Sequence, residues 1–291
     1  MLENFLDYLG QITERKAVKK PKSREFIDIM ARVHPNAIEI PAPNIPSSYM
    51  PPLQFTHNLN PLDKARISGC WMELNKITTE RLVLNCKQHG GTIQGAIQAA
   101  FMVAMCKEQE KQYPLPQIIV NMAPINMRPY VDPPLEAQDC VSGSAGLIWA
   151  QAIASTQPLW SIVKEATEKL RHEIEIKRGL RWWKALEAKE PQIPPTFMAS
   201  SIGKTPLGTS YGPIRLLGVK IIGGGYDNPR IGQAGTMLHA YTIQQRLNLT
   251  FAFTFPPIAY EWGSRFLDKI VAILRCLASE KGNEALVVDF L

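Results

Sequence analysis

The sequence predicts a mixed α/β fold whose sheet combines parallel and antiparallel strands. The composition is ordinary for a globular protein, with 45% hydrophobic and 20% charged residues, which excludes collagen, coiled coil and wholesale disorder. The 23 prolines and 19 glycines imply many turns and extended stretches, which favours this class over a helical bundle. The later strand-like segments follow one another without helices between them, and that order is typical of a mixed sheet.

The chain divides into residues 1–60 and residues 61–291. Met1–Ile12 carries apolar residues at helical spacing and predicts a helix. A basic run follows from Arg15 to Arg24, either as a solvated loop or as a patch that faces an anion. Pro35–Pro61 is rich in proline, which fixes φ and donates no hydrogen bond, so we expect an extended connector between the two parts.

The larger part begins with alternating elements and then turns to strands. Thr78 or Thr79 is expected to start its first helix, and Gly90 or Gly91 is expected to end it in the left-handed conformation. Thr92 is expected to cap a second, apolar and buried helix. Strands are predicted over residues 65–74, 117–124, 142–150, 197–202, 214–222, 237–243, 247–255 and 286–290, and helices over 79–89, 93–107, 159–178 and 260–277. A continuation of the third helix through Trp182, Trp183 and Leu186 is the alternative to an end at Arg178.

Charge and cysteine content narrow the choice of partners and compartment. The net charge of +6 suits an anionic ligand, but without a clustered basic face it does not indicate nucleic acid. The five cysteines are odd in number and form no C-x-x-C pair, so we expect neither a disulfide framework nor a metal site, and a reducing compartment fits best. The N-terminus lacks the pattern of a signal peptide, and the most apolar stretch, Ala96–Cys106, is too short to span a bilayer. A cytoplasmic protein is the expectation.

One set of residues has the sequence order of a serine esterase, but the secondary structure expected around its serine differs from that of such an enzyme. Gly208–Gly212 fits G-x-S-x-G around Ser210, and Asp227 and His239 follow in the order Ser, Asp, His. His89–Thr92 resembles an oxyanion loop. A nucleophile elbow lies between a strand and a helix, however, whereas a β-like run follows Ser210. A hairpin turn is therefore expected, with the esterase as an alternative.

Four segments follow one another along the chain in a recognisable order. They are the helix at Met1–Leu9, the threonine-capped, alanine-rich Gly91–Ile97, the turn at Pro124–Tyr130, and the strand end at Ser200–Gly203. This order resembles the second half of the chloramphenicol-acetyltransferase-like superfamily, in which a helix follows an H-H-x-x-x-D-G motif and N-L-R-P and S-N-x-G segments come later. The branches that it resembles most are the alcohol acetyltransferases and the polyketide-associated acyltransferases, with peptide-synthetase condensation domains as cousins.

The resemblance implies a two-layer sandwich in which residues 1–60 are a remnant of the first lobe and 61–291 form the second lobe. It implies transfer of an acyl group from acyl-CoA, a co-substrate rather than a bound cofactor, to a small hydroxyl- or amine-bearing acceptor. Asn126 and Arg128 would support the active site, the arginine by pairing with the aspartate of the motif. Ser200, Ser201 and Gly203 would line the tunnel, and the two serines would bind the tetrahedral intermediate.

The sequence departs from this superfamily in one respect. None of its five histidines lies in H-H-x-x-x-D-G, and the second histidine of that motif is the superfamily's general base. We therefore expect an N-terminally truncated chain without its catalytic histidine, which is inactive alone and self-associates through an exposed lobe interface. A non-catalytic interaction module of the same fold is the further alternative.

Overall fold

The computed structural model describes residues 14, 27–52, 66–136, 139, 143–205, 207–223, 236–255 and 258–291. The strands are β1 Arg66–Leu74, β2 Gln117–Asn126, β3 Ser144–Ile153, β4 Phe197–Lys204, β5 Ser210–Tyr211, β6 Ile214–Arg215, β7 Thr236–Ile243 and β8 Arg246–Phe255. The α-helices are α2 Lys76–Gln88, α3 Ile93–Gln109, α4 Leu159–Glu175, α5 Arg178–Glu187 and α6 Tyr260–Leu277. Short 3-10 helices cover Met30–Arg32, Pro35–Glu39, Arg128–Tyr130, Glu280–Asn283 and Val287–Phe290.

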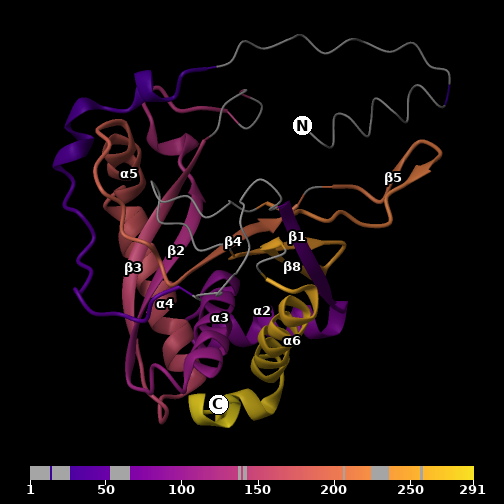
Figure 1. Ribbon diagram of the computed structural model, residues 1–291. Helices are drawn as coiled ribbons and strands as arrows, with labels where there is room; N and C mark the ends of the chain where they lie inside the picture. The colour runs from indigo at the N-terminus through magenta and orange to yellow at the C-terminus, as the bar shows by residue number, and fades with distance from the viewer. Residues whose placement is uncertain are drawn as a thin grey trace.

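Six strands form one sheet in the order β1-β8-β7-β4-β2-β3 (Figure 1). β4 runs parallel to both β2 and β7, whereas the other neighbours in this sheet are antiparallel. The predicted mixed sheet is therefore confirmed. β5 and β6 form a separate two-stranded hairpin that projects from the sheet in Figure 1.

α2, α3, α4 and α6 cover one face of the sheet and enclose the main core, whereas Trp182 of α5 packs on the opposite face beside Ile148. α3 lies at the centre, and almost all of its residues are buried, as its apolar sequence predicts. Its Phe101 stacks on Phe197 of β4, with ring centroids 4.1 Å apart. Gly95 brings α3 against α4, because a Cβ at that position would lie 2.2 Å from Thr167 Oγ1. The predicted cap of α3 is also present, since Thr92 Oγ1 accepts a hydrogen bond from Gly95 N at 3.1 Å.

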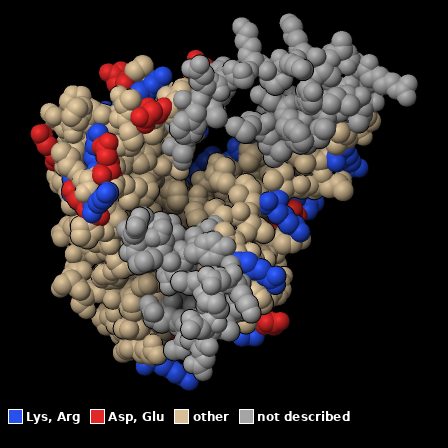
Figure 2. Space-filling model, turned by 45° about the horizontal axis from the view of Figure 1, so that its top comes forward, with Lys and Arg blue, Asp and Glu red and all other residues tan. Residues whose placement is uncertain are grey.

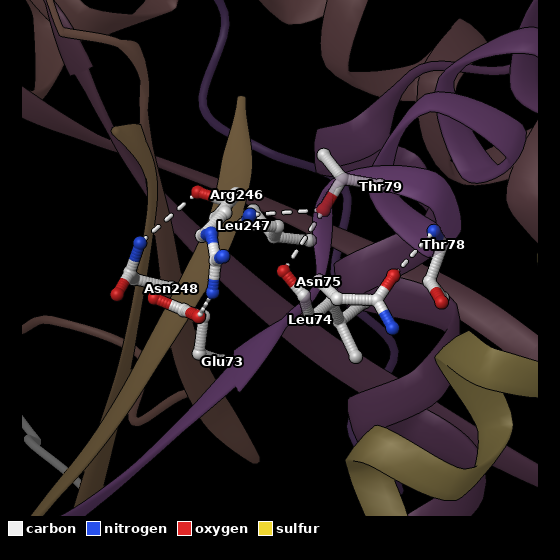
Figure 3. Close-up of polar contacts among 8 residues, drawn as sticks. All are labelled: Glu73, Leu74, Asn75, Thr78, Thr79, Arg246, Leu247 and Asn248. Carbon is white, nitrogen blue, oxygen red and sulfur yellow. Dashed lines mark hydrogen bonds and ion pairs between the residues drawn. The ribbon is translucent and has the colours of Figure 1, made fainter. Parts of the chain in front are cut away.

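The helix α2 begins earlier than the sequence indicates. Asn75 caps it by accepting a hydrogen bond from Thr78 N at 2.9 Å. Thr79 is buried instead and joins three elements, as Figure 3 shows: its hydroxyl donates to Leu74 O at 3.2 Å and accepts from Leu247 N at 3.0 Å. The predicted end of the helix is confirmed, since Gly90 has φ +70°.

Three predicted elements differ from the structure. The helix predicted over 159–178 forms as α4 but ends at Glu175, because Lys177 adopts a left-handed conformation, with φ 56° and ψ 36°, and a separate helix α5 begins at Arg178. The strand predicted over 214–222 stops at Arg215, because the following residues bond to side chains of β7 rather than to a neighbouring strand. The last predicted strand is a 3-10 helix, Val287–Phe290, after Asp289 accepts from Leu286 N at 2.9 Å.

The proline-rich connector is only partly extended. It opens with the 3-10 helix Pro35–Glu39, which His34 caps through its Nδ1 atom, and residues 41–49 then have no helix or strand. Met50 is fully buried and donates its N–H to Ile118 O at 2.8 Å, so the connector is attached to β2. Residues 53–61 of the connector, the helix expected over Met1–Ile12 and the basic run after it lie outside the described residues.

Four cysteines that the structure describes are free thiols. Burial raises the pKa of Cys70, Cys86 and Cys106 to about 12, so these thiols stay protonated and unreactive at neutral pH. Of the helices in the described ranges, none is both long and apolar enough to cross a membrane.

Candidate functional site

β2 and β4 are paired over only two residues and then separate (Figure 1). Their ladder joins Asn121 to Phe197 and Met122 to Met198, although β2 continues to Asn126 and β4 continues to Lys204. Parallel strands that part in this way leave their carboxyl ends open to a ligand. The predicted residues Asn126 and Arg128 follow one of these ends, and Ser200, Ser201 and Gly203 lie along the other.

The end of β4 is bent by a β-bulge. Its register with β7 shifts between Ser201 and Gly203, so that Ile202 is the extra residue. Gly203 has φ +80°, and a Cβ there would meet nothing within 4 Å, which leaves space beside this backbone. Bulges re-aim side chains and are frequent next to active sites. Ser200, just before the bulge, is 9% exposed and lies beside His239 of β7.

Two glutamines of α3 hold β4 where β2 no longer pairs with it. Gln94 Nε2 and Gln98 Nε2 both donate to Ala199 O, at 3.1 and 3.2 Å. Side-chain amides thereby replace the hydrogen bonds of a neighbouring strand and keep Ser200 in place. Sequence reasoning missed both residues. The available signal was a pair of amide side chains one turn apart on an otherwise apolar helix.

The end of β2 leads into a turn that positions Arg128. Asn126 Oδ1 accepts hydrogen bonds from Arg128 N at 3.2 Å and from Arg128 Nη1 at 3.5 Å. The arginine side chain lies across Gly143, where a Cβ would come within 2.6 Å of Arg128 Cγ. Asn126 and the glycine therefore fix the direction of the guanidinium group, and the two predicted residues of this turn act as one unit.

A polar row crosses the sheet on the face opposite the main core. It joins Ser200 of β4, His239 of β7 and Thr250 of β8, which are neighbours in register. His239 is 7% exposed, and its Nε2 donates to Gly223 O at 2.6 Å. Burial lowers the pKa of His239, so its imidazole is neutral at physiological pH. Trp71, half exposed at the end of the row, lies 3.9 Å from Lys220 Nζ in a cation–π contact.

The arrangement expected of a serine esterase does not form. Ser210 is exposed in the β5–β6 hairpin and pairs with Arg215, so it lies in no strand-to-helix elbow. His239 lies on β7 beside Ser200 instead, and Asp227 lies outside the described residues. His89, of the supposed oxyanion loop, stacks on Trp160 of α4, with ring centroids 4.3 Å apart. The order of these residues along the sequence therefore does not place Ser210 beside His239.

Comparison with known proteins places this geometry in a family. The family model described as phthiocerol/phthiodiolone dimycocerosyl transferase C-terminus matches residues 63–221, more than half of the chain. No curated protein matches the sequence. A similar solved structure is that of polyketide synthase associated protein 5 from Mycobacterium tuberculosis, with a TM-score of 0.60 and 13% identity over 96% of this chain and 69% of that one.

Two further structures share the fold. The condensation domain of the Monacolin K polyketide synthase has a TM-score of 0.64 and 13% identity, over 98% of this chain and 67% of that one. The trichothecene 15-O-acetyltransferase from Fusarium sporotrichioides has a TM-score of 0.55 and 11% identity, over 73% of this chain and 47% of that one. These structures confirm the expected α/β fold, and together with the matched family model they identify the chain as a member of the phthiocerol/phthiodiolone dimycocerosyl transferase C-terminus family, among the polyketide-associated acyltransferases.

Proposed function

We propose that the chain supplies the second lobe of a CoA-dependent O-acyltransferase, which moves an acyl group from acyl-CoA to a small alcohol or amine. The observation that carries this proposal is the separation of β2 and β4 after Met122 and Met198. It leaves the Asn126–Arg128 turn and the bulged Ser200–Gly203 strand end beside the same opening. Membership of an acyltransferase family makes acyl transfer the chemistry to expect there.

Each of these residues has a defined part in the proposed reaction. When the acceptor oxygen attacks the thioester carbonyl, negative charge develops on the carbonyl oxygen, and the hydroxyl of Ser200 donates to it. Ser201, the other serine expected to bind this oxygen, follows Ser200 in β4 and points to the opposite face of the sheet, beside Ala240. The C–S bond then breaks, and the CoA thiolate leaves and takes up a proton. Gly203 leaves room for substrate to approach the backbone. Arg128, oriented by Asn126, holds the loop that carries the base through the aspartate of that loop.

The proposed reaction also needs a general base, and none of the histidines in these 291 residues lies in the H-H-x-x-x-D-G motif that would supply it. His239 is the described histidine nearest to Ser200 in register, but its Nε2 proton is held by Gly223 O at 2.6 Å. We therefore assign the base to an H-H-x-x-x-D-G segment outside this sequence. A positioned base contributes about 10²–10⁴ in rate, so the chain alone should show little or no acyl transfer.

The surface charge is compatible with a phosphate-bearing co-substrate. In Figure 2, acidic and basic side chains intermix at the left, whereas basic ones predominate among the charged side chains at the right. Arg215 lies in the β5–β6 hairpin and Lys220 contacts Trp71 of β1, whereas Arg246 of β8 is paired with Glu73 at 2.6 Å. A basic surface raises the local concentration of an anion such as CoA.

The test is a thiol-release assay with acetyl-CoA and a panel of alcohols. The chain is assayed alone and after fusion to a first lobe that carries H-H-x-x-x-D-G. The fusion should turn over, and Ser200→Ala and Arg128→Ala should each lower kcat/KM by about 10²-fold. Arg171→Ala, an exposed arginine of α4, is the matched control and should have no effect. Turnover by the chain alone would contradict the assignment of the base, and an inactive fusion would favour the non-catalytic module.

A further inference from the structure

β3 is an outer strand of the six-stranded sheet, and among the described strands it pairs with β2 alone. Every second residue of such a strand directs its N–H and C=O away from the sheet, where another chain can pair with them. Figure 1 shows α5 and the indigo segment of residues 27–52 beside this edge. The outward backbone groups of β3 therefore face a region that other parts of the molecule partly enclose.

The hydrogen bonds of the neighbouring strand identify the outward residues of β3. Val120 of β2 lies opposite Ala150 in register, but its N–H and C=O both bond to Thr196 on the other side of β2. Val120 and Ala150 are therefore a pair without mutual hydrogen bonds, and the backbone groups of Ala150 point outward. Bonded and non-bonded pairs alternate along an antiparallel ladder, so Gly146 and Ile148 are outward residues as well.

Side chains cover the outward carbonyls near both ends of β3. Trp183 Nε1 donates to Ser144 O at 3.0 Å, and Lys169 Nζ donates to Ala150 O at 2.5 Å. The two outward residues between these carbonyls receive no such bond from the part of the chain that the structure describes. The middle of the edge therefore keeps two N–H and two C=O groups available to a ligand.

Two cavities lie along this uncovered stretch. The larger, of about 440 Å³, is lined by Ile148, Trp149 and Ala150 in succession. Successive side chains of a strand point to opposite faces, so a cavity that touches three of them in a row lies at the edge of the strand. The smaller, of about 90 Å³, is lined by Gly146 and Ile148. Because Pro43 and Ile148 line both cavities, the two form one groove, the β3 groove.

We propose that the β3 groove binds an extended peptide segment of a partner protein, which adds a strand antiparallel to β3. One peptide residue exchanges two hydrogen bonds with the N–H and C=O of Ile148, and the residue two positions later does the same with Gly146. Three successive residues are enough for these four bonds. The middle one directs its own N–H and C=O away from β3. The larger cavity falls within the range of about 300–1,000 Å³ that is usual for ligand pockets.

The walls of the groove specify the side chains of the peptide. The two paired residues project to the same face as Ile148, where Trp182 and Ile193 pack beside it and line the smaller cavity. Apolar side chains fit there. The middle residue projects to the face that α4 covers, where Lys169 and His172 line the larger cavity, so a polar side chain fits there. The groove therefore selects the order apolar, polar, apolar.

The outward N–H of Ile148 allows a direct test by ¹H–¹⁵N NMR. In the full chain labelled with ¹⁵N-isoleucine, the Ile148→Val variant identifies the resonance by its loss. Titration with acetyl-Val-Ser-Val-amide should shift this resonance downfield in a saturable manner, because the N–H gains an acceptor. An Ile148 resonance that the peptide leaves unmoved would overturn the proposal.

Two ester-containing peptides distinguish strand pairing from non-specific binding. An ester oxygen in place of the N–H of the third residue removes the donor to Gly146 O, so the affinity should fall about 10-fold by calorimetry. An ester at the middle residue is the matched control, because it removes an N–H that points away from β3, and its affinity should equal that of the parent peptide. Equal affinities of the two esters would contradict pairing with β3.

A variant of the chain removes the outward N–H itself. Proline at an edge position lacks an N–H that the ladder does not use, so Ile148→Pro should weaken binding of the parent peptide about 10-fold. Ile148→Val keeps the N–H, is the control and should bind like the parent chain. Unchanged affinity of a folded Ile148→Pro would overturn the proposal. If Ile148→Pro does not fold, the two ester peptides decide alone.

Discussion

Across β7 and β8, the two faces of the sheet have opposite characters. On the helix-covered face, β8 contributes Phe251 and Phe253, which are 0% and 1% exposed, to one continuous aromatic core. On the other face, the same strand contributes Thr250, which lies beside His239 in register. Segment 216–223 crosses that face and is held by polar contacts, such as the bond from Tyr241 Oη to Val219 O at 2.6 Å.

This difference separates the residues that stabilise the fold from those that can act on a substrate. The helix face buries large apolar side chains, which is the main source of folding free energy. At β1, β7 and β8, the opposite face keeps hydroxyls, an imidazole and a half-exposed tryptophan, which contribute little apolar burial but can bind and orient a substrate. Its β2–β3 part instead buries an apolar cluster that includes Val120, Met122 and Ile148. Substitutions on the two faces should therefore separate into losses of stability and losses of function.

The largest expected effect lies in the aromatic core. Phe251→Ala should lower the free energy of unfolding by about 3–5 kcal/mol, because it leaves a cavity among rings packed 5–6 Å apart, such as Phe266 at 5.1 Å. Trp71→Ala, on the other face, should cost about 1 kcal/mol, since the side chain is half exposed. Denaturant unfolding of both variants checks the contrast, and equal losses would break it.

A smaller decrease in the free energy of unfolding is expected at Thr79, which joins β1, α2 and β8 (Figure 3). Thr79→Val should cost about 1–3 kcal/mol, because the buried N–H of Leu247 loses its acceptor. Thr78→Val is the control, since Thr78 takes part in the cap of α2 through its backbone N–H alone. Thermal melting measures the stability of the two variants. If Thr78→Val is destabilised as much as Thr79→Val, the loss comes from placing a β-branched valine at the start of α2 and not from the lost hydrogen bond to Leu247.

These contacts also show what the sequence could predict. The cap at Thr92 and the left-handed Gly90 depend on neighbouring residues, so local patterns were sufficient for both. The break between α4 and α5 depends on Lys177, a residue type with no preference for φ 56°, and only the packing around it selects that conformation. Local pattern predicts Thr79 as a helix start, because its bond with Leu247, 168 positions away, has no local signature.

Contacts between residues far apart in the sequence are equally hard to predict at the candidate site. Short motifs predict Arg128 and Ser200 as site residues, whereas no motif points to Gln94 and Gln98, because their shared acceptor, Ala199 O, lies more than 100 positions away. The order of residues pairs His239 with Ser210 only in the alternative esterase interpretation. Its neighbour in the structure is Ser200, because β4 pairs with β7, and no spacing in the sequence reveals that pairing.

Buried His239 should make stability depend on pH. Burial lowers the pKa of this group below the ordinary 6.5, so in acid the unfolded chain takes up a proton that the folded chain does not. The free energy of unfolding should therefore fall as the pH decreases below about 6.5, by at most about 1.4 kcal/mol per pH unit. His239→Gln should flatten this part of the profile in denaturant titrations between pH 5 and pH 7.5. An unchanged slope would assign the dependence to other groups.

Substitution of Leu217 is expected to have the smallest effect on stability and a measurable effect on self-association of the chain. This side chain is 85% exposed on the segment that crosses the polar face, where Ile222 is 52% exposed. Exposed apolar patches favour association, so Leu217→Lys should lower the apparent mass in light scattering and change stability by no more than about 0.5 kcal/mol. Leu84→Lys, at a 54% exposed leucine of α2, is the control on the helix side. If it has the same effect, added charge rather than the location of the patch is responsible.

The contacts of Met50 attach residues 27–52 to the sheet. Its side chain is fully buried, its N–H bonds to Ile118 O at 2.8 Å, and its own carbonyl accepts from Thr196 Oγ1 at 2.5 Å. Residues 27–52 therefore behave as a docked piece of the sheet rather than as a tether. A protease site introduced between residues 52 and 66 would cut the polypeptide without releasing the smaller fragment. The two pieces should co-elute as one particle, and separately expressed halves should reconstitute it.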